Sequence, residues 1–201
     1  MSVNEEKNII GFWGYPPPEL IKTYKKNFPN AKWIDFDVDF GAEDRNILPD
    51  SYCKIVKNII NNAFLYKNNL ITILAPIGKD KCDSGWFASE VLKDLGFPVI
   101  PTIFEDVTPK KELKISVSDL PLRKKIELIT AQIVVEQSIS LNKVPPKFGF
   151  WGVPPNDLSI LELFPPETHV YGWTRCVEAG TPADINLEMY VDKDVPTVFY
   201  S

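Results

Sequence analysis

The stretch GFWGYPP at residues 11–17 returns as GFWGVPP at residues 149–155, identical at six of seven positions. In both copies an apolar run enters a Trp-Gly corner and leaves through a pair of prolines into a helical pattern. Proline cannot continue a central strand but is favourable at the first position of a helix, so each copy predicts a strand that turns into a helix. Self-similarity at a fixed offset is typical of a duplicated supersecondary unit. The repeat therefore predicts two related lobes.

Apolar patterning around the repeat predicts strands that alternate with helices. Residues 70–75 form a continuous apolar run, which is typical of a strand buried on both faces of a parallel sheet. Such alternation implies parallel pairing and right-handed crossovers. Strands are expected over residues 8–13, 31–36, 70–75, 99–104, 148–151, 168–173 and 195–200, and helices over residues 19–27, 49–64, 86–95, 118–141 and 183–190.

The predicted fold is α/β, with two flavodoxin- or Rossmann-like βαβ lobes related by internal duplication. The sheets are mainly parallel, and a ligand cleft is expected between the lobes, where ligand sites are common. Residues 1–110 form the predicted N-terminal lobe, residues 111–145 a linker with a bridging helix, and residues 146–201 the C-terminal lobe with the second copy of the repeat.

Composition narrows the class of protein. Of the 201 residues 44% are hydrophobic and 24% charged, as in ordinary globular proteins. The net charge of −5 and the absence of a long basic run argue against a nucleic-acid partner. No apolar stretch approaches the roughly 18 residues that span a membrane, and the first residues show no signal region, so a cytoplasmic protein is predicted. Three cysteines in such a chain are expected to be free thiols.

Residues 35–40, of sequence DFDVDF, alternate strictly between acidic and apolar side chains. In a strand this pattern puts three carboxylates on one face. One interpretation is a solvated or edge-strand face; the other is a carboxylate cluster for a hard cation such as magnesium. An EF-hand loop does not fit, because Phe40 stands where that loop needs glycine.

The connection at residues 76–85 follows a predicted buried strand and enters a helix. Ligands bind outside such strand ends, and helix amino termini lower the pKa of a thiol. Cys82, near Lys79, is therefore a candidate reactive thiolate or metal ligand, with an ordinary loop cysteine as the alternative. Cys53 lies within a predicted helix, where a packed, inert thiol is expected. The loop lacks the Gly-Lys-Ser/Thr ending of a phosphate-binding loop.

Aligning the two repeats at their Phe-Pro pairs shows where the lobes differ. Asp37 falls opposite Trp173, and Asp39 falls opposite Arg175. A guanidinium at that position suits a carboxylate or phosphate on a ligand, although Arg175 could instead pair with Glu178 at the surface. The predicted catalytic residues are Arg175, Cys176 and Glu178, the predicted ligand-binding residues are Trp13, Asp37, Asp39, Lys79, Trp151 and Trp173, and the predicted metal ligands are Cys82 and Cys176.

The order of features resembles the component proteins of the 2-hydroxyacyl-CoA dehydratase family over roughly half of the chain. The similar pieces are PPELI at residues 17–21, Cys82-Asp83 after a buried strand, Cys176 after a later strand and DVPT at residues 194–197. In that family, cysteines at strand ends hold an iron-sulfur cluster between flavodoxin-like subdomains. The resemblance implies Cys82 and Cys176 as candidate cluster ligands.

Together these patterns predict a cytoplasmic protein that binds a small anionic ligand or a metal centre, whose cofactor would be an iron-sulfur cluster or a divalent metal. The sequence leaves open whether it is an enzyme acting on an anionic metabolite. A rival hypothesis is a non-catalytic interaction or scaffold subunit whose Trp-Pro corners pack against a partner. The protein would then be a homo-oligomer or the partner subunit of another protein.

Overall fold

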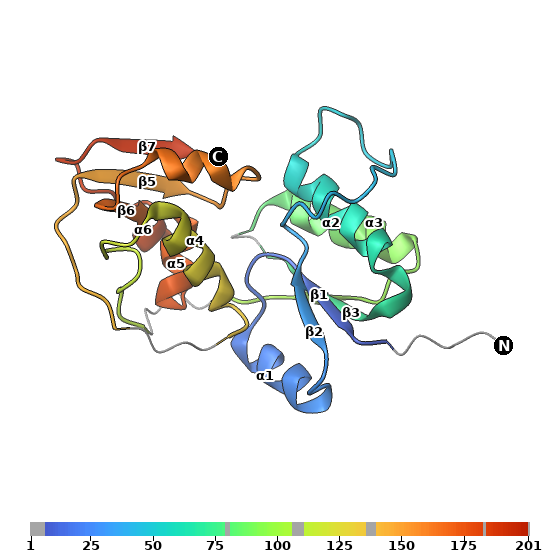
Figure 1. The fold of residues 1–201 in the computed structure, drawn as a ribbon. Coiled ribbons are helices and arrows are strands. Elements are labelled where there is room, and N and C mark those ends of the chain that lie inside the picture. The colour runs from blue at the N-terminus through green and yellow to red at the C-terminus, as the bar shows by residue number, and fades with distance from the viewer. Residues whose placement is uncertain (1–6, 79–80, 106–110, 136–139, 183, 201) are drawn as a thin grey trace. The chain divides into compact units, whose positions relative to one another are not determined.

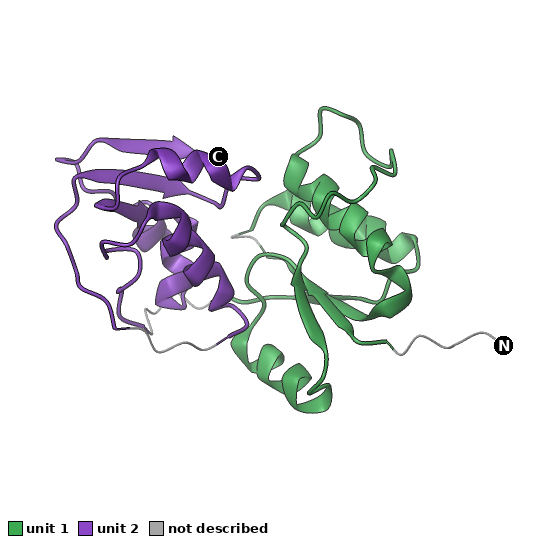
Figure 2. Ribbon diagram, in the orientation of Figure 1, with its two compact units in different colours: residues 1–104 green, residues 105–201 purple. Residues whose placement is uncertain are grey.

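The chain folds into two compact units, residues 1–104 and residues 105–201 (Figures 1 and 2). Each unit contains one all-parallel sheet, so the predicted α/β class with parallel pairing is confirmed. The computed structural model describes residues 7–78, 81–105, 111–135, 140–182 and 184–200.

Unit 1 is built on a four-stranded sheet of order β2-β1-β3-β4. The apolar run predicted as a buried strand is β3, which is buried at six of its seven positions. Helices α2 and α3 pack against each other, and Figure 1 shows α1 on the opposite side of the sheet. The elements are β1 (Ile9–Phe12), α1 (Pro18–Asn27), β2 (Lys32–Asp35), α2 (Lys54–Leu65), the 3₁₀ helix η1 (Lys67–Asn69), β3 (Leu70–Pro76), α3 (Asp83–Asp94) and β4 (Val99–Thr102).

The core of unit 1 lies between the sheet and the α2–α3 layer. Helix α2 contributes an apolar stripe at helical spacing, and α3 contributes Ala88 and Leu92. Phe36, fully buried, packs across β1 at Gly11. A Cβ built on Gly11 would lie 2.5 Å from the Phe36 ring, so this position accepts only glycine without a shift of the ring.

Unit 2 is built on a three-stranded sheet of order β6-β5-β7. Its core joins α4, β5, η2 and β6 through the buried side chains of Leu122, Ile126, Phe150, Leu161 and Val170. The elements are α4 (Leu122–Ala131), β5 (Phe148–Gly152), the 3₁₀ helix η2 (Leu158–Leu163), β6 (Thr168–Tyr171), α5 (Trp173–Ala179), α6 (Ile185–Glu188) and β7 (Thr197–Tyr200).

Both copies of the repeated stretch begin in an inner strand of their sheets, β1 in unit 1 and β5 in unit 2. The continuations differ, because the first copy enters the ten-residue helix α1 and the second enters only the 3₁₀ helix η2. Gly14 in the first corner has φ +55°, a backbone conformation that glycine adopts without strain.

Several predicted boundaries were wrong. Strand β2 ends at Asp35 and the chain turns over residues 36–38, so the alternating residues 35–40 do not form one strand face. Helix α2 begins at Lys54 rather than near residue 49, which leaves Cys53 exposed instead of packed within a helix. Helix α4 ends at Ala131, ten residues before the predicted end, and belongs to unit 2.

Candidate functional site

Two carboxyl groups with raised pKa values and a buried, unpaired hydroxyl lie at the carboxyl edge of the unit 1 sheet. In a sheet of this order the chain leaves β1 toward β2 and later returns to β3 on the other side, so the strand order reverses between β1 and β3. Ligands of open α/β sheets bind outside the carboxyl ends of the strands at such a reversal. Gly14, after β1, lies here beside Pro76, the last residue of β3, since a Cβ built on Gly14 would be 4.0 Å from the Pro76 ring.

Trp13, a predicted ligand-binding residue, is buried at this reversal. Its indole Nε1 finds no hydrogen-bond partner among the described residues. The same nitrogen lies 3.4 Å from a Cβ built on Gly85, in the first turn of α3. Trp13 therefore packs in the core between the end of β1 and the start of α3, and its role in binding stays a prediction.

Directly beside this corner lies the acidic turn, which we define as residues 35–38. The Asp37 carboxylate accepts a hydrogen bond of 2.8 Å from the Gly14 backbone N–H. The Asp35 carboxylate accepts one of 3.0 Å from the Asp37 backbone N–H. Asp37 is thus tied to the corner that contains Trp13, and these two predicted site residues do lie at one edge of unit 1.

Helix α2 fixes the backbone of the acidic turn. The Asn62 side-chain amide donates to two carbonyls of the turn, at 3.1 and 2.8 Å, and the Asn58 amide donates to the Asp37 carbonyl at 3.0 Å. The buried Phe36 ring anchors the turn to β1 through its contact with Gly11. Because three side chains, those of Phe36, Asn58 and Asn62, hold the backbone of the turn, the two carboxylates have a defined position.

Burial raises the pKa of Asp37 to about 6, although the hydrogen bond from Gly14 opposes the shift. The pKa of Asp35 is raised well above its usual range, first by burial and then by the neighbouring charge of Asp37. A carboxyl group that titrates near neutral pH can give and take a proton under physiological conditions. Perturbed pKa values of this kind are enriched at functional sites.

Asp39 does not join this pair. Its carboxylate lies 3.2 Å from Lys54 Nζ, and its pKa is lowered, chiefly by the Gly41 backbone N–H and also by Lys54. Among the described residues no group of three His, Cys, Asp or Glu side chains could hold a metal ion together. The predicted three-carboxylate face is therefore replaced by a half-buried pair, Asp35 and Asp37, and a separate exposed ion pair.

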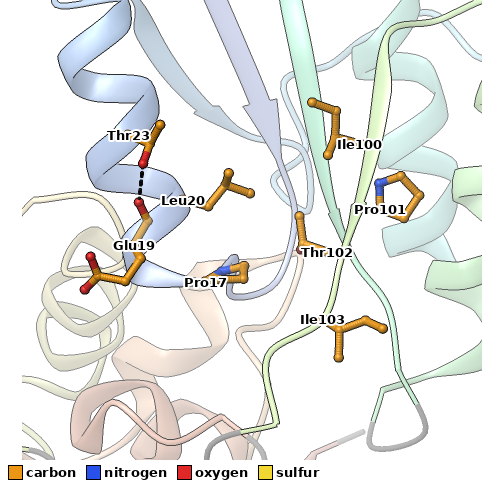
Figure 3. Close-up of a pocket in the computed structure, with 8 residues that line it drawn as sticks. All are labelled: Pro17, Glu19, Leu20, Thr23, Ile100, Pro101, Thr102 and Ile103. Carbon is orange, nitrogen blue, oxygen red and sulfur yellow. Dashed lines mark hydrogen bonds between the residues drawn. The ribbon is translucent and has the colours of Figure 1, made fainter.

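An open groove runs between α1 and β4 at the same edge (Figure 3). Its volume is about 530 Å³, and apolar side chains form most of its walls. The lining residues are Pro17, Glu19, Leu20 and Thr23 from α1 and its start, and Ile100, Pro101, Thr102 and Ile103 from β4 and its end.

Thr102 lies in the wall of this groove with an unpaired hydroxyl that is itself enclosed. Its side chain is only 6% exposed, and its Oγ1 has no hydrogen-bond partner among the described residues. The hydroxyl of Thr23, by contrast, donates to the Glu19 carbonyl at 2.8 Å. A buried polar group without a partner costs about 1–3 kcal/mol, so a ligand group would be stabilised here if the Thr102 side chain rotated its hydroxyl into the groove.

In unit 2 the three predicted catalytic residues share helix α5 but have different surroundings. The Glu178 carboxylate is buried and accepts backbone hydrogen bonds of 2.8, 2.6 and 3.0 Å from residues 114, 115 and 116. No ion pair between Glu178 and Arg175 occurs in the part of the chain that the structure describes. The contacts give Glu178 a structural task, namely holding residues 114–116 against α5.

The cysteine thiols differ sharply in environment. Cys176 is fully buried with its Sγ 3.7 Å from the Asp184 carbonyl, and burial raises the pKa of its thiol to about 12. Such a thiol is protonated at neutral pH and is a poor nucleophile or metal ligand. Cys82 is exposed at the amino-terminal cap of α3 in unit 1. Lys79 lies outside the described residues.

The remaining predicted residues also lie in unit 2. The Trp151 indole donates to the Glu188 carbonyl at 2.7 Å and its ring contacts Phe199. Trp173 is the half-buried first residue of α5. The Arg175 guanidinium lies over the rings of Tyr171 and Tyr190, a contact that the sequence did not indicate.

Comparisons with protein-family models, curated proteins and solved structures found no match to this chain. Within the described residues, no helix combines the length and apolar character that a membrane crossing requires. The function is therefore inferred from the geometry of the two units.

Proposed function

We propose that unit 1 binds a small molecule at the carboxyl edge of its sheet. The observation that carries this proposal is the groove of about 530 Å³ between α1 and β4, with the buried, unpaired Thr102 hydroxyl in its wall. Small-molecule sites typically have volumes of about 300–1,000 Å³, mainly apolar walls and a few polar groups that fix orientation. The groove has this volume and this apolar lining, and it is wide open to solvent.

The chemistry of the groove sets the class of ligand. Leu20, Ile100 and Ile103 suit an apolar or planar body, and the Thr102 hydroxyl would meet a single hydrogen-bonding group by rotating out of its enclosed position. The acidic turn borders the same β1–α1 connection through Gly14. Carboxylates repel an anion, so the part of the ligand nearest Asp37 is neutral or positively charged. Asp37 would supply a general acid or base if binding leads to turnover.

A ligand screen with side-chain resolution tests the proposal. The methyl resonances of Ile100, Ile103 and Thr102 are followed by NMR while a library of small metabolites is added to the full chain. We expect ligands that shift these signals saturably, and Thr102→Val should weaken their binding about tenfold, the equivalent of one hydrogen bond of about 1.4 kcal/mol.

Two further variants separate the groove from non-specific binding. Leu20→Trp fills the groove and should abolish the shifts, whereas Leu163→Trp, at an 83% exposed position of unit 2, should leave them unchanged. If no compound shifts the groove methyls, or if binding survives Leu20→Trp, the proposal is wrong.

The interaction-subunit hypothesis is favoured by a different observation. Strand β7 is an edge strand of its sheet, and its Val198 and Phe199 side chains are exposed. Exposed apolar edge strands are templates for pairing with another chain. Light scattering tests this alternative: association that Val198→Lys reduces would support it, and a monomer at all concentrations would count against self-association.

The iron-sulfur prediction and the duplication with its cleft stay predictions. Cys82 and Cys176 belong to different units, and the buried, protonated thiol of Cys176 does not suit a cluster ligand in this conformation. Purification without oxygen, followed by iron analysis and an absorption spectrum, tests the cluster directly. Colourless, iron-free protein would remove it.

A further inference from the structure

The Arg175 guanidinium in unit 2 packs against two adjacent tyrosine rings. Its guanidinium carbon lies 5.3 Å from the ring centroid of Tyr171 and 5.0 Å from that of Tyr190. Tyr171 ends β6 and is 2% exposed, whereas Tyr190 follows α6 and is 52% exposed. The two rings also contact each other at 6.1 Å between centroids. The guanidinium is therefore fixed at the carboxyl edge of the three-stranded sheet.

Two of the three nitrogens of the half-buried guanidinium are enclosed without a hydrogen-bond partner. Both Nε and Nη1 are enclosed and make no hydrogen bond within the described part of the chain. The neighbouring acids are occupied: Glu178 accepts from residues 114–116, Asp192 accepts from the Asp194 N–H at 3.0 Å, and Asp184 caps α6. No acidic side chain of the described residues forms an ion pair with Arg175.

A guanidinium with two enclosed and unpaired nitrogens is unfavourable. Arginine does not lose its proton in proteins, so it cannot escape the penalty by becoming neutral. Burial lowers the pKa of Arg175, which reports the same penalty. Contacts with aromatic faces compensate for only part of the lost hydration. A buried donor without a partner calls for an explanation, and a bound ligand is one that also accounts for the fixed position of the group.

We propose that Arg175 is the anchor of an oxyanion site that binds the carboxylate or phosphate group of a small molecule. A planar guanidinium matches either group through two parallel hydrogen bonds. Tyr171 is buried and holds the guanidinium in place, and the exposed Tyr190 ring moves to give the ligand access to the enclosed nitrogens. The site lies in unit 2 and does not depend on the ligand site proposed for unit 1.

The chain contains only three arginines, which makes the test direct. Protein labelled with ¹⁵N-arginine gives three Nε–H signals, from Arg45, Arg123 and Arg175. Inorganic phosphate and, separately, succinate are added at constant ionic strength. We expect the Arg175 signal to shift saturably below about 10 mM of one anion, an affinity of a few kcal/mol. Saturation by phosphate alone assigns a phosphoryl group, and saturation by succinate alone assigns a carboxylate.

Controls within the same spectrum decide the outcome. Arg45 and Arg123 should shift only weakly and linearly, and the groove methyls of unit 1 should not respond. Arg175→Lys, which keeps the charge but loses the planar fork, should weaken the anion at least tenfold as measured on backbone signals of α5. If the Arg175 signal responds no more than that of Arg45 to both anions, the site does not exist and the contacts of Arg175 with the two tyrosines are structural.

Discussion

Replacing Asp37 by asparagine should stabilise unit 1 at alkaline pH. The Asp37 side chain keeps its shape in Asp37→Asn, and the amide oxygen can still accept the hydrogen bond from Gly14. The variant removes only the charge that burial disfavours. Because the folded pKa is raised, the folded state binds the proton more tightly than the unfolded state, and ionisation lowers the free energy of unfolding.

The size of this effect follows from the pKa values. A rise from the ordinary 3.8 to about 6, at 1.36 kcal/mol per pH unit, corresponds to about 3 kcal/mol. The penalty is absent well below pH 4, grows between pH 4 and 6 and is complete above about pH 7. Asp37→Asn should therefore raise the free energy of unfolding by up to about 3 kcal/mol at pH 8 and by about half of that at pH 5.

Urea unfolding followed by methyl NMR gives the required resolution. The signals of Ile73 report unit 1, and those of Val170 in unit 2 serve as an internal reference. Asp39→Asn is the matched control, because this exposed carboxylate pairs with Lys54 and its removal should cost no more than about 1 kcal/mol. Destabilisation by Asp37→Asn at pH 8, or an equal effect at both pH values, would refute the reasoning.

Two further variants and a thiol reagent test the packing of the two units. Gly11→Ala should destabilise unit 1 by about 1–3 kcal/mol in the same urea assay, because its Cβ would overlap the Phe36 ring; a neutral effect would contradict the close contact. Glu178→Gln should destabilise unit 2 by about 2–3 kcal/mol, since an amide cannot accept all three backbone N–H groups, and a stability equal to wild type would disprove the anchoring role. A thiol reagent should modify two cysteines rapidly and Cys176 only on unfolding, whereas three rapid equivalents would show that Cys176 is accessible.

The fold class could be predicted because its signals are local. The apolar run of β3 indicates a buried strand, and the proline pairs that follow β1 and β5 indicate where a strand gives way to a helical segment. Neither signal depends on which strands pair with one another. Sheet order is a different property. It depends on which strands meet across tens of residues, and the reversal between β1 and β3 has no local signature.

The alternating acids of residues 35–40 gave a wrong strand prediction because hydrogen bonding by side chains competed with the strand. The Asp35 carboxylate accepts the N–H of Asp37, which bends the chain just after β2. Phe36 then turns inward onto Gly11 rather than alternating across a sheet face. The acidic and apolar side chains do alternate along residues 35–40, but the backbone turns there instead of continuing as a strand.

The candidate sites were predicted only in part. Arg175 was selected for its charge, but the tyrosines that hold it lie 4 residues before it and 15 after it, on separate elements. Asp37 was selected and Asp35 was not, since burial at a strand end cannot be seen in a pattern of alternating acids. Thr102 looked like any β-branched strand residue, and only the groove distinguishes it.

The anchoring of residues 114–116 by Glu178 has a practical consequence for dissecting the protein. A fragment that starts at the second repeat, near Pro146, would lack these residues and would also lose Leu122 and Ile126 from its core. It would leave a carboxylate facing no donors and an uncovered apolar surface on Phe150. Expression of unit 2 by itself should begin ahead of residue 111, because the repeat marks a motif of the sequence rather than the start of an autonomous folding unit.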